Sequence, residues 1–182
     1  LLIAQPDIGQ TLLVVFCWAV LIFTSGINIY ILLAIFIAGA SLLTYLIIYV
    51  PRFDYIQGRI FSFFNRETGT HNFQSDKAIE SITSGGFFGK GIGEGVLKNR
   101  VPEAHTDYII SVISEEFGVV AIMLILLLFL ILIYMVFKKI SFETNDKAKL
   151  ILIGSISLIL MQATIHIGVN IRLFPTTGMT LP

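Results

Sequence analysis

The sequence predicts an all-α polytopic membrane protein, and three observations lead to that prediction. Hydrophobic residues make up 55% of the 182-residue chain and charged residues only 13%, where a soluble domain carries about 25% charged residues. The charges are unevenly placed, because none occurs between Asp7 and Arg52. The apolar runs are continuous and do not alternate with a period of two, which argues against a transmembrane β-barrel.

The uncharged runs predict four membrane-spanning helices, since a span needs about 20 apolar residues. The first two fall at about 9–25 and 29–49, separated by Gly26–Asn28, because glycine and asparagine favour turns. The third and fourth fall at about 117–137 and 150–171. The chain opens on leucine and shows no signal peptide, so we expect it to be an internal piece of a longer protein.

The loop between the third and fourth spans orients the protein. Residues 138–149 hold four lysines against two acids, and a short basic loop is typical of the cytoplasmic side. The long loop, 51–116, and the last segment, 172–182, are then expected on the outer face. Within the long loop we predict short helices at 55–65, lying in the headgroup region or capping the bundle, and at 74–83.

Charge and polar residues narrow the possible functions. The net charge is zero, so no basic field exists to attract a nucleic-acid partner. No Asp, Glu, Lys or Arg lies in the four spans, where a transporter would more often carry one. The fourth span instead places Gln162, His166 and Asn170 on one side of a helix. They either form interhelical hydrogen bonds or line a polar cavity that opens to the outer face. His166 has no cysteine or acidic partner at metal-ligand spacing, so we expect no metal there.

A glycine-rich stretch lies in the long loop. Six glycines fall between Gly85 and Gly95, which indicates unusual backbone angles or a close approach of the backbone. The stretch matches neither a Walker A loop nor a dinucleotide fingerprint. It is either a tight structural turn or a cradle that binds pyrophosphate through backbone N–H groups. In the second interpretation Lys90, Lys98 and Arg100 would add positive charge.

A short polar cluster precedes the third span. Glu103, His105 and Asp107 lie close together in sequence. Asp107 is either the cap of the helix that follows or an acid that serves as a general base. Glu115 and Glu116 are interpreted as ordinary charges where that helix enters the membrane.

Several motifs resemble those of the SEDS family (FtsW and RodA). They extend over the whole chain in the order that the family shows, and together they are highly specific. Residues 93–95, 102–108 and 175–178 favour the FtsW branch. The matching segments are Gln5-Pro6-Asp7-Ile8-Gly9, the glycine-rich 85–95, Pro102-Glu103-Ala104-His105-Thr106-Asp107-Tyr108, Glu115-Glu116-Phe117-Gly118 and Phe174-Pro175-Thr176-Thr177-Gly178-Met179-Thr180-Leu181-Pro182.

The resemblance implies part of an enzyme with about ten spans that polymerises lipid II into glycan strands. The reaction would take place on the outer face of the bacterial cytoplasmic membrane, during cell division. Asp107 matches the family's proposed catalytic acid. It would take the proton from the 4-hydroxyl of the acceptor sugar, whose oxygen attacks the anomeric carbon of the donor. Undecaprenyl pyrophosphate would leave, and the configuration would invert.

Partners and alternatives follow from the same resemblance. The family's usual partner is a class B penicillin-binding protein, among other division proteins. Lys90, Lys98 or Arg100 could neutralise the leaving pyrophosphate, and Glu103, His105 and the polar residues of the fourth span are candidate substrate contacts. A divalent cation could assist, although the sequence shows no ligand set for one. Two other functions stay open: a flippase for lipid-linked precursors, and a non-catalytic division scaffold.

Overall fold

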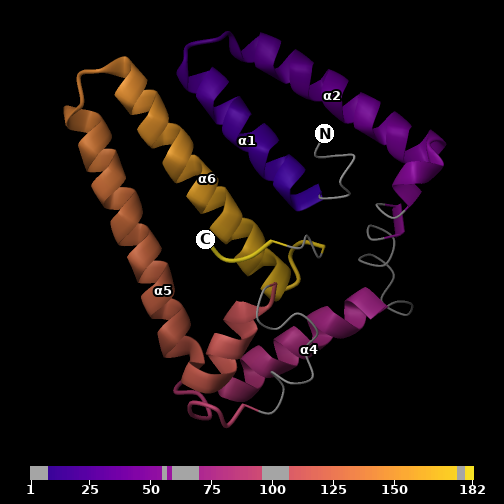
Figure 1. Cartoon of the computed structure of the whole chain (residues 1–182), viewed down its shortest axis with the longest axis vertical. Helices are drawn as coiled ribbons and strands as arrows, with labels where there is room; N and C mark the ends of the chain where they lie inside the picture. The colour runs from indigo at the N-terminus through magenta and orange to yellow at the C-terminus, as the bar shows by residue number, and fades with distance from the viewer. Residues whose placement is uncertain (1–7, 55–56, 59–69, 96–106, 176–178) are drawn as a thin grey trace.

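A computed structural model describes residues 8–54, 57–58, 70–95, 107–175 and 179–182 of the chain (Figure 1). Throughout these residues the regular structure is helical and no strand occurs, so the all-α prediction is confirmed. The elements are α1 (Ile8–Thr24), α2 (Ile29–Tyr49), the 3₁₀ turn η2 (Pro51–Phe53), α4 (Thr70–Gly85), α5 (Ile109–Phe142) and α6 (Asp146–Asn170).

Three of these helices, α2, α5 and α6, are long and apolar enough to cross a membrane, and α1 is a shorter apolar helix. The 17 residues of α1 span roughly 26 Å at 1.5 Å per residue. The turn expected at Gly26–Asn28 is present, with Gly26 at φ 88°. The Asn28 side chain caps α2 by accepting a hydrogen bond from the Tyr30 N–H at 3.0 Å. The first two helices therefore coincide closely with the predicted ranges.

The third helix differs from the expected 117–137. α5 begins at Ile109 and ends at Phe142, and Gly118 interrupts it with φ 75° and ψ −174°. Figure 1 shows the short first part and the long second part meeting at the lower end of the molecule and diverging from there. Residues 109–117, mostly placed in the long loop by the sequence pattern, therefore form a separate helical arm. We call residues 109–117 the first arm of α5.

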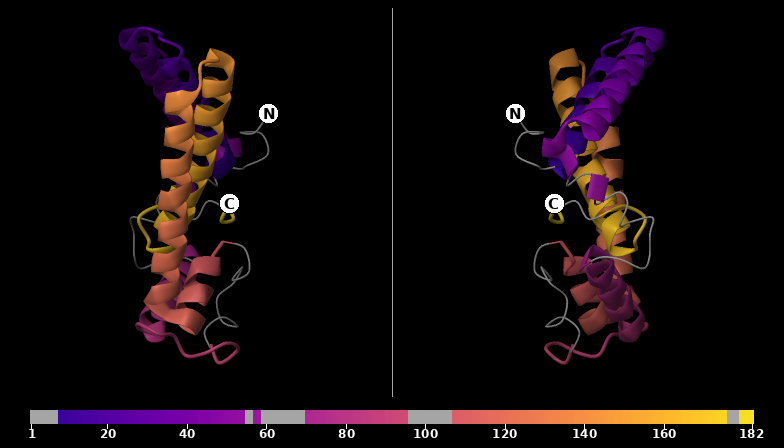
Figure 2. Two further views of the ribbon diagram at one scale, coloured as in Figure 1. Left: turned by 90° about the vertical axis from the view of Figure 1, so that its left-hand side faces the viewer. Right: turned by 90° about the vertical axis from the view of Figure 1, so that its right-hand side faces the viewer.

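α6 lies between α1 and α5 and packs against both, while α2 packs against α1 and α4 mainly against α5 (Figure 1). Figure 2 shows α4 and the first arm of α5 together at the end of the long helices, far from the α5–α6 connection. α4 covers more than the predicted 74–83, and its Ala78 is fully buried. The predicted helix at 55–65 lies outside the described residues, apart from residues 57–58. The buried cluster that joins these elements contains Leu13, Ala78, Tyr108, Val112, Ile165, Val169 and Met179.

The end of α6 is fixed beside α4. The Leu173 N–H donates to the Gly168 carbonyl at 2.7 Å, and the Arg172 N–H donates to the Val169 carbonyl at 3.1 Å. These two bonds form a Schellman motif, which normally places glycine where Arg172 stands. Arg172 adopts φ 61° there, and its guanidinium pairs with Asp76 on α4. This ion pair links the last turn of α6 to the helix that packs on the first arm of α5.

Candidate functional site

Asp107 lies immediately before α5 and is buried, with 7% of its surface exposed. Tyr108, which follows it, occupies the N-cap position of α5 and is fully buried. The backbone carbonyl of Asp107 accepts a hydrogen bond at 3.0 Å from the side-chain amide of Asn170 at the end of α6. The candidate base is therefore held where the first arm of α5 meets the end of α6.

Asn170 joins the two helices through both atoms of its amide. Its Oδ1 accepts a hydrogen bond from the backbone N–H of Ser111 at 3.2 Å. Its Nδ2 donates to Asp107 and also to the carbonyl of His166 at 2.9 Å. Ser111 is the third residue of α5, whose N–H usually bonds to an N-cap side chain. Here the side chain of Asn170 on α6 takes that role, and Asn170 has no exposed surface.

The polar stripe on α6 favours the first of its two interpretations. His166 is 1% exposed, and its Nδ1 lies 3.5 Å from Nδ2 of Asn170. Gln162 donates from Nε2 to the backbone carbonyl of Thr180 at 3.0 Å. These contacts connect α6 with the start of α5 and with the C-terminal segment. Asn170 therefore forms interhelical hydrogen bonds, whereas the contacts given above for His166 and Gln162 lie within α6 and with the C-terminal segment.

Replacing Asn170 with alanine should destabilise the protein. The variant would remove two buried hydrogen bonds. The Ser111 N–H would lose the Asn170 acceptor and keep the Tyr108 carbonyl at 3.0 Å, and the Asp107 carbonyl would lose the amide donor. An intramolecular hydrogen bond contributes about 0.5–1.5 kcal/mol to stability. We expect a loss of that order for each bond, measured by thermal unfolding of the intact protein. Thr164→Ala, on the exposed side of α6, is the control, and equal unfolding temperatures for the two variants would contradict the proposed contacts.

The glycine-rich stretch folds around the break in α5. At Gly118 the helix loses its regular hydrogen bonds, and the stretch supplies substitutes on both sides. Two loop N–H groups donate to carbonyls before the break, and two N–H groups after the break donate to loop carbonyls. The bonds run from Lys90 to Glu115 (2.9 Å), from Gly91 to Glu116 (3.0 Å), from Val119 to Gly86 (3.0 Å) and from Val120 to Phe87 (3.3 Å).

Glycine is required in this stretch because two backbones approach closely. A Cβ added at Gly85 would overlap the carbonyl of Ser114, and one at Gly89 would overlap the carbonyl of Glu116. The backbone N–H of Gly93 is also engaged, because it donates to Glu116 Oε1 at 3.3 Å. The structure therefore favours the tight turn over the pyrophosphate cradle, since several of the N–H groups that a cradle would use already have acceptors.

Glu115 is not an ordinary charge where the helix enters the membrane, and that interpretation is wrong. Its side chain is fully buried, and Oε1 lies 3.2 Å from the ammonium group of Lys90. The Ser81 hydroxyl of α4 lies 3.2 Å from Oε2. The break at Gly118 turns the first arm back toward α4, which places this carboxylate inside. The sequence holds one signal that points to it: a lysine in a glycine-rich turn and a glutamate three residues before a glycine.

The remaining predicted site residues are less informative. Lys98, Arg100, Glu103 and His105 lie outside the described residues. Lys90 is described, and it is paired with Glu115 while 36% of its side chain stays exposed. Within the described part of the chain, no group of three or more His, Cys, Asp and Glu residues could hold a metal ion.

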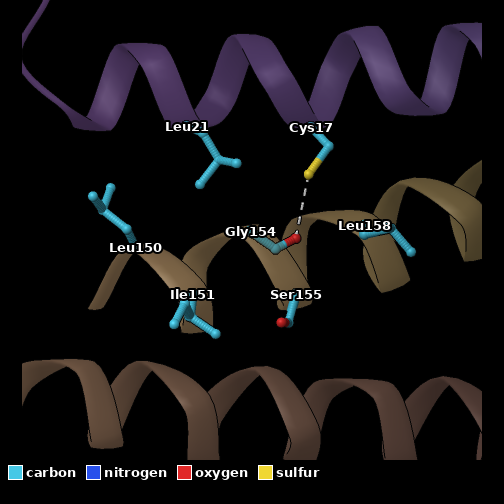
Figure 3. A pocket seen from close by; sticks show the side chains of 7 residues that line it. All are labelled: Cys17, Leu21, Leu150, Ile151, Gly154, Ser155 and Leu158. Atoms are coloured by element: carbon cyan, nitrogen blue, oxygen red, sulfur yellow. Dashed lines mark hydrogen bonds between the residues drawn. The ribbon is translucent and has the colours of Figure 1, made fainter. Parts of the chain in front are cut away.

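A pocket lies between α1 and α6, away from Asp107 (Figure 3). Its α6 lining includes Gly154, sixteen positions before Asn170, or roughly 24 Å along the helix. Cys17 extends from α1 across this space, with Sγ 3.5 Å from the carbonyl of Gly154. The lining is mostly aliphatic, so the pocket reflects helix packing, and it is separate from the candidate site. The lining residues are Cys17, Leu21, Leu150, Ile151, Gly154, Ser155 and Leu158.

Comparison with known proteins decides the family. The family model described as a cell cycle protein, FtsW/RodA/SpoVE, matches residues 1–182. The chain belongs to the FtsW/RodA/SpoVE family. The predicted resemblance is thereby confirmed, and the chain is a bacterial membrane protein with several apolar helices.

Curated members of the FtsW/RodA/SpoVE family match the whole chain. Proteins from Caulobacter vibrioides (35% identical) and Francisella salina (38% identical) are each named probable peptidoglycan glycosyltransferase FtsW, and this chain covers 46% of each. A relative from Enterococcus hirae carries the same name, with 32% identity and 49% covered. The chain thus spans about half the length of the curated relatives it matches.

A solved structure matches over the same extent. Its description is "Structural coordination of polymerization and crosslinking by a peptidoglycan synthase complex". The match has a TM-score of 0.77 and 27% identity, and it covers all of this chain and 50% of the solved one. The helical arrangement described above is therefore shared with a protein of known structure.

Proposed function

We propose that the intact protein polymerises lipid II into glycan strands during bacterial cell division, with Asp107 as the general base. The relatives named probable peptidoglycan glycosyltransferase FtsW support this activity and the FtsW branch. The observation that carries the proposal is the placement of Asp107, a buried acid whose backbone is fixed by Asn170 between two helices. Such anchoring gives a catalytic group a defined position, which general-base catalysis needs.

The mechanism is a single displacement. The Asp107 carboxylate takes the proton of the acceptor sugar's 4-hydroxyl group. As the proton leaves, the hydroxyl oxygen forms a bond to the anomeric carbon of the donor. The bond from that carbon to the pyrophosphate oxygen breaks, undecaprenyl pyrophosphate leaves with the electron pair, and the configuration inverts. Lys90, and in addition Lys98 and Arg100, are the candidates for neutralising the leaving charge.

The arrangement of charges supports an outer-face site in the cytoplasmic membrane. Lysines lie around the α5–α6 connection at one end of the helices, and Asp107 contacts Asn170 at the other end of α6. Short basic loops are cytoplasmic, so Asp107 faces outward. At that face it meets a lipid-linked substrate whose tail stays in the membrane. We propose a class B penicillin-binding protein as partner, because the solved relative is described with both polymerization and crosslinking.

The test is a polymerisation assay with the intact protein and its transpeptidase partner. We expect labelled lipid II to become long glycan strands with inverted configuration at the new linkage. Transfer of labelled lipid II between leaflets without polymer would support the flippase. Neither activity, with normal recruitment of division proteins, would support the scaffold.

A further inference from the structure

A continuous series of polar contacts connects Asp107 with the glycine-rich stretch. It passes through α6, the first arm of α5 and α4. Its four middle members, Asn170, Ser111, Ser81 and Glu115, have no exposed surface. The contacts are Asp107 O to Asn170 Nδ2 (3.0 Å), Asn170 Oδ1 to Ser111 N (3.2 Å), Ser111 O to Ser81 Oγ (3.1 Å), Ser81 Oγ to Glu115 Oε2 (3.2 Å) and Glu115 Oε1 to Lys90 Nζ (3.2 Å).

Ser81 is the member that ties Glu115 to the start of the arm. Its single hydroxyl group lies within hydrogen-bond distance of both the Ser111 carbonyl and the Glu115 carboxylate. Ser111 is in turn held from its N–H side by Asn170. The first turn of the arm, directly after Asp107, therefore forms hydrogen bonds with α4 on one side and with α6 on the other.

The buried Glu115 carboxylate calls for a role other than stability. Its burial removes hydration, which offsets much of the attraction to Lys90, whose side chain stays 36% exposed. Glu115 and Lys90 nevertheless meet at the one place where α5 is broken. Glu115 also lies against the backbone of Gly95, the last described residue of the stretch. The carboxylate thus connects the middle and the last residue of the glycine-rich stretch with the arm that begins after Asp107.

We infer that Glu115 is a positioning residue for Asp107. By holding the first arm of α5 against α4 and the glycine-rich stretch, it sets where the arm begins and hence where Asp107 stands. This inference rests on the proposed function of Asp107. A displacement of about 1 Å at a catalytic group can lower a rate about 100-fold, so a modest shift of the arm is enough.

The test uses Glu115→Gln in the intact protein with its transpeptidase partner. Glutamine keeps the shape, removes the charge and replaces one of the two acceptor oxygens with an NH2 donor. We expect kcat for lipid II to fall about 10- to 100-fold, with KM unchanged and the unfolding temperature near that of the wild type. Glu94→Gln, an exposed acid of the same stretch, is the matched control and should keep wild-type turnover.

A second variant guards against loss of folding. Lys90→Met alone leaves the buried Glu115 carboxylate without its ion-pair partner. The double variant Glu115→Gln/Lys90→Met removes both charges. If the two side chains act as one unit, the double variant should be no slower than the slower single variant. Wild-type kcat in Glu115→Gln would overturn the inference. So would a rise in KM alone, which indicates substrate contact, or a rate loss that follows the unfolding temperature, which indicates a purely structural role.

Asp107→Asn, assayed in parallel, separates the two proposals. An inactive Asp107→Asn beside a fully active Glu115→Gln overturns only the positioning role. An active Asp107→Asn overturns the proposed base, and with it the positioning role, whatever Glu115→Gln does.

Discussion

Gly118→Ala should severely destabilise the protein. Gly118 adopts φ 75° and ψ −174°, a region that essentially only glycine occupies and that costs another residue about 1–3 kcal/mol. The Cβ of the new alanine would also overlap the backbone carbonyl oxygen of Phe87, which belongs to the glycine-rich stretch. Relief requires breaking some of the four hydrogen bonds around the break, each worth about 0.5–1.5 kcal/mol. We expect a total loss of about 3 kcal/mol or more, measured by unfolding of the intact protein in detergent.

Gly39→Ala is the matched control. Gly39 lies in α2, and a Cβ there would meet no atom within 4 Å. Alanine is the better helix former by about 1 kcal/mol, so this variant should be as stable as the wild type or more so. Equal stability of the Gly118 and Gly39 variants would show that the break does not depend on the close backbone approach.

The helices could be predicted from the sequence, because long uncharged runs leave few alternatives to membrane helices. The Gly26–Asn28 turn also carries a local signal, and α1 and α2 lie on either side of it. The break at Gly118 could not be predicted in the same way. It lies at the very start of the predicted third span, and the hydrogen bonds that sustain it come from residues 86–91, about thirty positions earlier. The local sequence pattern around Gly118 carries no information about a contact with such distant residues.

The candidate site was predicted in part. Asp107 and Asn170 could each be singled out, one by resemblance and one by helical spacing. Their contact joins residues 63 positions apart, so spacing along one helix could not show that the amide binds the Asp107 carbonyl. Glu115 was missed for a related reason. A glutamate near the start of an apolar run ordinarily faces water, and only the reversal at Gly118 places this one inside.

Asp107→Asn should abolish most of the polymerase activity. Asparagine has nearly the same shape, and the backbone carbonyl that binds Asn170 is unchanged, so the fold should persist. The amide cannot take a proton from the acceptor hydroxyl. A general base contributes about 10²–10⁴-fold to a rate, which corresponds to roughly 3–5 kcal/mol of barrier. We expect turnover to fall by that factor, with membrane insertion and partner binding retained.

The most direct measurement compares the initial rate of glycan formation from labelled lipid II for the wild type and Asp107→Asn. Both are assayed as intact proteins with the transpeptidase partner, at equal amounts of folded complex. A rate at least about 100-fold lower in the variant, with Glu94→Gln at the wild-type rate, is the predicted result. Equal rates for wild type and Asp107→Asn would contradict the central claim that Asp107 is the base.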